Sequence, residues 1–483
     1  MWELLLVLHT VSAQVAFVTT FAGGSATGYV DGVGSNAEFK QPAAISSFST
    51  AAGVFYVADT FNADVRAVTP TGSVTTVAGQ GFPGLVDGIG TNAQFGFFGG
   101  IAADPLGTVI IGDSDNNKIR YIDPTGSVTT LAGGGGGQVS GSVDGYGTVA
   151  LFANPRGIAI TETGFANGYI FVADSNNHKV RAIAILDPER TCLVSTIAGG
   201  GQDGASFGSA DGIGTGALFR NPEAFAFSEN SSHLYLSDFF YGKVRVVYCP
   251  SLPCSVTTLV GGGSDGETSG VVDGIGTNAL FAGPSGLALG AGGLLYVADA
   301  GSNRIRSINL ATSLVTTIAG RYSSGIGLVD GVGTNALFSY PTGISVDATG
   351  SLIVVDSDNS ALRRIIISSV TLSPSITPTV SVSPTPSLTA LATSTPTPSL
   401  IPVSPNPPPA KTPIGTYVGI FVGGAVCGAL VLFFARSGVG ALSTCVRPKS
   451  SAQRSTPTFA ANGFVGGEVP LLSVSDSGAL EIN

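Results

Sequence analysis

Histidine and basic side chains are scarce in this chain of 483 residues. Its three histidines are His9, His178 and His233, and charged residues make up 11% of the sequence. Acidic residues outnumber basic ones by 31 to 21, so the net charge is −10, and a nucleic acid is not an expected partner. Neither a GxSxG nucleophile motif nor a GxxxxGK[ST] phosphate loop occurs. Catalysis therefore has little support, and no catalytic residue is assigned.

What the chain does contain is a repeat of short β-rich runs separated by turn residues. An aspartate ends the second run of each copy, at Asp59, Asp113, Asp174, Asp238, Asp299 and Asp356. An arginine follows seven residues later, at Arg66, Arg120, Arg181, Arg245, Arg306 and Arg363. The pattern predicts a set of similar sheets that must pack on one another, because one such sheet cannot bury both of its faces.

A third marker, V-[ST]-T-x-[AV]-G, shows how the repeat closes. It ends the copies at Gly79, Gly133, Gly199, Gly261 and Gly320, and its sixth instance lies ahead of the first aspartate, at 18–23. A strand displaced in this way pairs into the last sheet of a ring and leaves no exposed edge. We therefore predict an all-β fold, a six-bladed β-propeller closed by an N-terminal strand.

The repeat resembles the NHL repeat. The resemblance is fullest from Pro155-Arg156-Gly157 to Arg181, which includes the run VADSNNHKVR, and it covers residues 18–367. It implies a propeller fold and a binding role, without selecting one function among the many that NHL propellers perform.

A second repeated element, D-G-x-G-[ST]-x-A-x-F, lies between the blades. Its copies begin at Asp31, Asp87, Asp144, Asp211, Asp273 and Asp330, and they end at Phe39, Phe95, Phe152, Phe219, Phe281 and Phe338. Asp-Gly favours a tight turn, and we expect each phenylalanine to fold back onto the sheets as an apolar plug. These inserts and the turns between second and third strands should share one face of the ring.

The two ends of the chain have other compositions. Residues 1–13 are predicted to be a secretory signal, although an ordinary hydrophobic N-terminus is the alternative, and 14–367 form the propeller. Residues 368–411 are rich in Ser, Thr and Pro and are predicted to be a disordered, O-glycosylated stalk. A bare linker would have the same extended shape.

Residues 412–435 are apolar, uncharged and long enough to cross a bilayer as one helix. More basic residues follow this span than precede it, which places the tail, 436–483, in the cytosol. The prediction is a single-pass type I protein of the plasma membrane or secretory pathway. Gly415, Gly419 and Gly423 recur every fourth residue and suggest a homodimer through the span, unless they reflect only the frequency of glycine in such helices.

Cysteine use fits an oxidising compartment. Cys249 and Cys254 flank a short hairpin and are the disulfide candidate, while Cys192 is left either to another pairing or as a free thiol. Asn230 begins the sequon Asn-Ser-Ser and is the glycosylation candidate.

The repeated aspartates first suggest a metal. The run Asp113-Ser114-Asp115-Asn116 begins like a calcium loop, but Lys118 stands where that loop needs glycine, so calcium has weak support and no cofactor is assigned. We favour a structural role, in which each aspartate caps its own turn and pairs with the arginine seven residues on.

Recognition through exposed aromatic side chains is what remains. Phe239, Phe240 and Tyr241 occupy the turn of blade four, and Phe97 and Phe98 adjoin the insert of blade two. They are the ligand-contact candidates, unless they pack beneath the inserts. The favoured hypothesis is a membrane-anchored module that binds protein or glycan. The alternative is a tethered hydrolase or lyase with a metal in the central channel.

Overall fold

The computed structural model describes residues 12–371, apart from 25, 47–52, 135–136, 162–167, 188, 202–203, 205, 229–231 and 322–324, together with 472–474 and 480–482. The chain forms two compact units, Met1–Ser381 and Val382–Asn483. In the second unit, β31 (Leu472–Val474) pairs antiparallel with β32 (Leu480–Ile482). The predicted span, nearly all of the predicted stalk and signal, and Asn230 lie outside the described residues. Within the described part, no helix is long and apolar enough to span a membrane.

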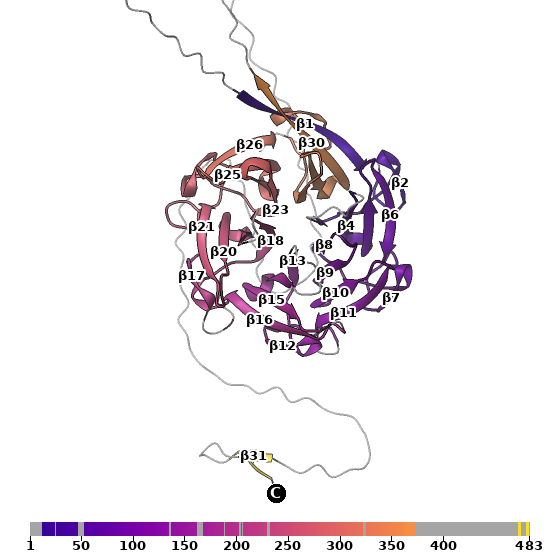
Figure 1. Ribbon diagram of the computed structural model, residues 1–483, viewed down its shortest axis with the longest axis vertical. Helices are drawn as coiled ribbons and strands as arrows, with labels where there is room; N and C mark the ends of the chain where they lie inside the picture. The colour runs from indigo at the N-terminus through magenta and orange to yellow at the C-terminus, as the bar shows by residue number, and fades with distance from the viewer. Residues whose placement is uncertain are drawn as a thin grey trace, which may run out of the picture. The chain divides into compact units, whose positions relative to one another are not determined.

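Six antiparallel sheets of five strands each surround a central axis, so the predicted six-bladed propeller is confirmed (Figure 1). The inner strands are β3 (Ala44–Ile45), β8 (Gly100–Ala103), β13 (Pro155–Ile160), β18 (Pro222–Phe227), β23 (Pro284–Gly290) and β28 (Pro341–Val346). The second strands are β4 (Phe55–Asp59), β9 (Val109–Asp113), β14 (Tyr169–Asp174), β19 (His233–Asp238), β24 (Leu294–Asp299) and β29 (Leu352–Asp356).

Two further strands complete the expected four in each blade. The third strands are β5 (Asp64–Val68), β10 (Lys118–Ile122), β15 (Lys179–Ile185), β20 (Lys243–Tyr248), β25 (Arg304–Asn309) and β30 (Ala361–Thr371). The fourth strands are β6 (Ser73–Ala78), β11 (Ser127–Gly133), β16 (Cys192–Gly199), β21 (Ser255–Gly261), β26 (Leu314–Gly320) and β1 (Ser12–Gly23).

A fifth strand at the rim of each blade comes from the Asp-Gly insert and was not predicted. These strands are β2 (Gly32–Val33), β7 (Gly88–Ile89), β12 (Gly145–Tyr146), β17 (Gly212–Ile213), β22 (Gly274–Ile275) and β27 (Gly331–Val332). Each insert therefore runs from the rim of its blade to the start of the inner strand.

The remaining elements are single turns of 3-10 helix. In the inserts they are η1 (Gly34–Asn36), η3 (Gly90–Asn92), η4 (Gly147–Val149), η6 (Gly214–Gly216), η8 (Gly276–Asn278) and η11 (Gly333–Asn335). Between second and third strands they are η2 (Thr60–Asn62), η5 (Ser175–Asn177), η7 (Phe239–Tyr241), η10 (Ala300–Ser302) and η12 (Ser357–Asn359), and η9 (Ala291–Gly293) follows β23.

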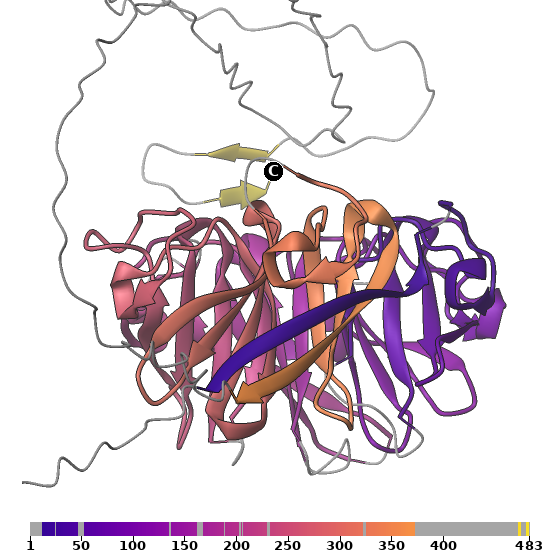
Figure 2. The same cartoon turned by 90° about the horizontal axis from the view of Figure 1, so that it is seen from above.

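The ring closes where the displaced N-terminal marker predicts. β1 lies between β30 and β27 in blade six, with Val18 opposite Ile365 (Figure 2). This pair continues to Ser12 and Thr371, so it extends beyond the expected propeller limits of 14 and 367 at both ends.

The inserts and the turns between second and third strands share one face, called here the loop-rich face. Asn62, in the first such turn, donates from Nδ2 to the carbonyl of Gly28, just ahead of the first insert, at 2.6 Å. Asn116 and Asn177 make the same kind of bond to the segment just ahead of the insert in their own blades, at 2.8 and 2.7 Å. The predicted crowding of these loops on one face therefore follows from direct contacts.

A fully buried arginine on the third strand holds each blade together. Arg66 donates from Nη1 to Asp59 and from Nη2 to Asp31, both at 2.7 Å. It also donates to the backbone carbonyls of Glu38 and Val30, at 3.0 and 3.1 Å. The corresponding bonds recur at Arg120, Arg181, Arg245, Arg306 and Arg363. One guanidinium thus ties the second strand to the insert that covers the blade.

The outer aspartate of the pair fixes the fourth strand as well. Thr76 donates to Asp31 from its backbone nitrogen at 3.1 Å and from its hydroxyl at 3.0 Å. The register slips by one residue between Val65 and Arg66, and this bulge sets the arginine opposite Thr76. An equivalent register shift adjoins the repeat arginine in each of the six blades.

The insert phenylalanines are the predicted plugs. All six are completely buried. The guanidinium carbon of each repeat arginine lies 5.0–5.3 Å from the centroid of its phenylalanine ring. The Nε of each repeat arginine has no hydrogen-bond partner within the described residues, so the phenylalanine ring supplies a further contact for the guanidinium.

One expectation about the inner aspartates was wrong. They do not cap the backbone of their own turns, as the helical turns that follow Asp59 and Asp174 show. The free oxygen of Asp59 instead accepts the backbone N–H of Lys40, the residue after the insert phenylalanine, at 2.8 Å. The carboxylate is directed to the insert because its other oxygen already accepts from Arg66.

Removing one repeat arginine should strongly destabilise the propeller. Arg120→Met leaves Asp113 buried without its cation, which costs about 3–5 kcal/mol of unfolding free energy in denaturant titrations. Adding Asp113→Asn should restore part of that loss, since the uncompensated charge is then gone. Arg321→Met, on an exposed arginine, is the control. Equal, small effects of Arg120→Met and Arg321→Met would contradict the central role of the network.

The aspartate pairs also predict an optimum of stability in mild acid. Burial raises the pKa of Asp59, Asp238 and Asp356 to about 6, against the effect of their hydrogen bonds and arginine partners. The folded state then holds protons that the unfolded chain has lost, so unfolding free energy falls as the pH rises from about 4 to about 6. In Asp31, hydrogen bonds from Thr76 and Arg66 outweigh burial and lower the pKa from 3.8, so stability is lost again in stronger acid.

Melting temperature should therefore be higher at about pH 5 than at about pH 7 or about pH 3. Asp238→Asn should reduce the difference between pH 5 and pH 7, because it removes one of the raised carboxylates. This variant also distinguishes the effect of the carboxylates on stability from that of His178. Burial lowers the pKa of His178, so this histidine makes the stability rise as the pH rises. A melting temperature that rises steadily to pH 7 would contradict the prediction.

Candidate binding site at the mouth of the central channel

One position of the repeat varies while its neighbours stay alike. The inner strands begin with Pro-x-Gly or a close variant, and the middle residue is Ala43, Gly99, Arg156, Glu223, Ser285 and Thr342 in blades one to six. All six residues line the same cavity on the axis of the ring. Because inner strands start at the loop-rich face, this cavity is the mouth of the channel on that face.

Each of these residues is followed by glycine or alanine, and the glycines let neighbouring inner strands converge. A Cβ on Gly157 would lie 2.3 Å from the carbonyl oxygen of Glu223, and one on Gly286 would lie 2.4 Å from that of Thr342. At these glycines the inner strands of neighbouring blades approach closely because no side chain intervenes. The residue before this small residue lines the axial cavity in every blade.

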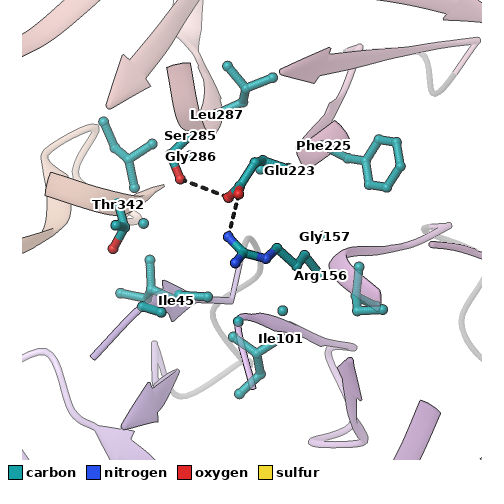
Figure 3. A pocket seen from close by; sticks show the side chains of 18 of the residues that line it. Ile45, Ile101, Arg156, Gly157, Glu223, Phe225, Ser285, Gly286, Leu287 and Thr342 are labelled. Atoms are coloured by element: carbon teal, nitrogen blue, oxygen red, sulfur yellow. Dashed lines mark hydrogen bonds and ion pairs between the residues drawn. The ribbon is translucent and has the colours of Figure 1, made fainter. Parts of the chain in front are cut away.

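The polar side chains at this position come from blades three to six. Arg156 of blade three forms an ion pair with Glu223 of blade four (Figure 3). The Nε of Arg156 also donates to Asn154 at 2.9 Å. Ser285 donates to the second oxygen of Glu223 at 3.4 Å. Glu223 raises the pKa of Arg156, so the arginine stays charged. Ala43 and Gly99 leave blades one and two without a polar side chain at this position.

Two more groups belong to this site. Thr342 is 8% exposed, and its hydroxyl has no hydrogen-bond partner among the described residues. Tyr340 also lines the cavity and is 40% exposed, with a backbone φ of 51°. Asn154 and Asn221 hold the equivalent position in other blades, where asparagine tolerates that left-handed conformation better than an aromatic residue does. A strained aromatic residue beside an orphan hydroxyl is the kind of arrangement found at binding sites.

The cavity itself is small. Its volume is about 100 Å³, roughly the space of three waters. Pockets that enclose a whole drug-sized ligand are several times larger. The mouth can therefore admit the end of a ligand, while the rest of that ligand would lie on the loop-rich face.

The predicted aromatic contacts divide by exposure. Phe240 is 51% exposed and is available on the surface, and Phe97 and Phe239 are half-buried. Phe98 and Tyr241 are buried, so neither offers a contact surface. Phe98 replaces the proline at the start of an inner strand, and its ring packs 5.3 Å from that of Phe95, an insert plug.

An exposed cation among these rings was missed from the sequence. The guanidinium of Arg220 lies 5.2 Å from the ring of Phe207 and 5.1 Å from that of Phe240. Arg156 and Glu223 were missed too, although the alignment of the six Pro-x-Gly segments contains the signal. A side chain that changes from blade to blade within a constant frame indicates recognition.

The three cysteines in the described residues form one disulfide and leave one free thiol. Cys249 and Cys254 form the predicted disulfide. Cys192 is free and buried, and its sulfur donates to the carbonyl of Leu131 at 3.5 Å. Burial raises the pKa of this thiol, which keeps it protonated and unreactive.

The channel mouth does not fit a calcium ion. Calcium takes six to eight oxygen ligands, whereas the one carboxylate here, Glu223, already accepts from Arg156 and Ser285. Throughout the described part of the chain, no group of three or more His, Cys, Asp or Glu side chains is placed to hold a metal ion.

Comparisons with known proteins support the NHL resemblance. The NHL repeat model matches residues 281–306 and 338–365, which begin at the insert phenylalanines of blades five and six. NHL repeat-containing protein 2 of Homo sapiens is 28% identical over 321 residues, covering 61% of this chain and 42% of that protein. Protein SUPPRESSOR OF QUENCHING 1, chloroplastic, of Arabidopsis thaliana is 24% identical over 301 residues, covering 60% of this chain and 27% of that protein. The chain thus spans less than half the length of these relatives.

Solved structures share the fold. A crystal structure titled as an auxiliary nutrient binding protein from Bacteroides ovatus has a TM-score of 0.54 at 18% identity, covering 73% of this chain and 77% of that one. A similar protein from Bacteroides thetaiotaomicron has a TM-score of 0.53 at 16% identity, covering 74% of this chain and 77% of that one. Similarity at this level of identity shows the propeller architecture alone.

The strain at Tyr340 can be tested through stability. Tyr340→Asn introduces the residue that blades three and four use at this position, so the melting temperature should stay level or rise. Tyr296→Asn, on a buried tyrosine of β24 without such strain, should lower it through lost packing. An equal fall in both variants would mean that Tyr340 serves the fold.

Proposed function

We propose that this chain is a cell-surface or endomembrane recognition protein whose extracytoplasmic propeller binds a protein or glycan through its loop-rich face. One observation carries the proposal. Arg156, Glu223, Ser285 and Thr342 come from four different blades and meet in one cavity, while the framework that positions them is repeated six times. The polar side chains differ from blade to blade at this axial position, within a framework that stays the same. This pattern fits ligand binding better than a structural role.

The surface around the mouth supports a contact larger than the cavity. Several of the segments that lead into the inserts carry exposed apolar side chains, among them Tyr29, Phe82, Phe207 and Ile326, each more than half exposed. Aromatic and arginine side chains are the residue types that most often anchor interfaces. Phe240 beside Arg220 is such a combination. A ligand end in the channel and a broader contact across the inserts would act together.

The cellular placement rests on the chain outside the propeller. The signal at 1–13, the stalk and the span at 412–435 together support a single-pass type I topology with the propeller outside the cytosol. The disulfide between Cys249 and Cys254 fits an oxidising compartment. Glycosylation at Asn230 and pairing of two chains through the glycine-rich span belong to the same proposal.

The competing function is a tethered hydrolase or lyase with a metal in the channel. It would need several free carboxylate or imidazole ligands at the mouth, where Arg156 already occupies the single carboxylate. The donor set therefore favours binding over metal-assisted hydrolysis.

The test is to locate binding on one face of the ring. The full-length chain, displayed on cells, is screened against a glycan array and a library of displayed extracellular proteins. Arg156→Ala/Glu223→Ala should lose the selected ligand, whereas Glu189→Ala should retain it. Glu189 is exposed on the hairpin between β15 and β16, at the strand ends opposite the loop-rich face. Equal binding by both variants would place recognition elsewhere and overturn the proposal.

A further inference from the structure

We infer that the group received by the channel mouth is neutral and hydroxyl-bearing, namely the edge of a terminal sugar of a glycan. The inference rests on the proposed function, since it names the ligand class of the same site. It follows from the charge balance, the hydrogen-bonding groups, the aromatic wall and the size of the mouth.

Charge balance argues against an ionic ligand. Arg156 and Glu223 already neutralise each other, and Glu223 is only 13% exposed. A ligand carboxylate that bound Arg156 in place of Glu223 would leave Glu223 without its counter-charge. A ligand ammonium that bound Glu223 would do the same to Arg156. Glu223 in particular is largely buried, and leaving a buried charge without its counter-charge is unfavourable. A neutral ligand can add bonds without breaking the pair.

The hydrogen-bonding groups match hydroxyls. The bonds of Arg156 to Glu223 and Asn154 use Nη1 and Nε, and its side chain is 44% exposed, so part of the guanidinium faces the channel as a donor. Glu223 is an acceptor beside it. A hydroxyl can accept from the arginine and donate to the carboxylate at once, and a neighbouring hydroxyl can pair with the orphan Thr342. A site built in this way rejects ligands that lack those hydroxyls.

Tyr340 supplies an apolar wall next to these polar groups. Tyr340 is among the residues that line the cavity, and its backbone stays in the left-handed region at φ 51°. The residues with positive φ at the equivalent position of four other blades carry no aromatic ring, namely Gln41, Asn154, Asn221 and Gly283. A sugar ring has an apolar C–H face and a polar rim, so an aromatic wall beside a donor–acceptor pair suits both. The volume of about 100 Å³ admits the edge of one ring, which is why a terminal sugar fits.

The experiment uses calorimetry and ligand-observed NMR on the full-length chain. The probes are the methyl glycosides of glucose, galactose, mannose and N-acetylglucosamine. Glucuronate, acetate, methylammonium and acetamide represent the ionic and amide alternatives. At least one methyl glycoside should bind at millimolar concentration, more tightly than any of these four.

Glu223→Gln should weaken that glycoside about tenfold or more and strengthen glucuronate, because the freed Arg156 then attracts an anion. Tyr340→Asn should weaken the glycoside without lowering the melting temperature, which separates a binding role from a structural one. Glu189→Gln is the matched control and should change neither probe.

Each other outcome overturns the inference. A glycoside that binds equally to wild type, Glu223→Gln and Tyr340→Asn binds at another place. Tighter binding of acetate, methylammonium or acetamide assigns the mouth to an ionic or amide group. If no glycoside binds but the Arg156→Ala/Glu223→Ala chain loses a protein ligand in the cell-display screen, the recognition function stands and its ligand is a protein. If neither probe set responds to changes at the mouth, both proposals fail.

Discussion

The buried arginine of each blade is the interaction on which the whole ring depends. Its guanidinium contacts the second strand and the insert and, through the outer aspartate, is linked to the fourth strand. A charge with no exposure to water is tolerated only with complete pairing, so its partners must stand at fixed places. Three features of each blade serve this pairing. They are the bulge beside the arginine, the Asp-Gly turn and the insert phenylalanine, and all three recur with it in the six blades.

This dependence separates stability from recognition. Side chains that hold a blade together lie beneath the inserts, while the axial residue makes no side-chain hydrogen bond within the described residues in three blades, at Ala43, Gly99 and Thr342. Ala43 and Gly99 show that the position tolerates the smallest residues. Arg156 and Glu223 can therefore differ between related propellers without a change of fold. A repeated scaffold with a variable axis is well suited to acquiring new ligands.

The sequence predicts the ring well because its signals are long-range and repeated. The aspartate–arginine spacing records a bond across one hairpin, and the displaced marker at 18–23 records the pairing of β1 with β30. The rim strands escape prediction because two residues, one of them glycine, carry no strand pattern. Phe98 and Tyr241 look like surface contacts because a turn sequence does not show what covers it. Arg156 and Glu223 stand 67 residues apart in the sequence and belong to different blades, so no local sequence pattern shows that they pair.

The path of β30 gives the ring a mechanical character. This strand runs from Ala361, on the loop-rich face, to Thr371 at the opposite end, and β1 lies beside it in antiparallel register along that length. A chain held beyond Thr371 and pulled by a ligand at the channel mouth would be loaded along its strands. The hydrogen bonds between β1 and β30 then bear tension together, in shear, and would not open one at a time from an end. The pairing of β1 with β30 would thus resist separation, and the propeller would stay folded while a bound ligand pulls on it.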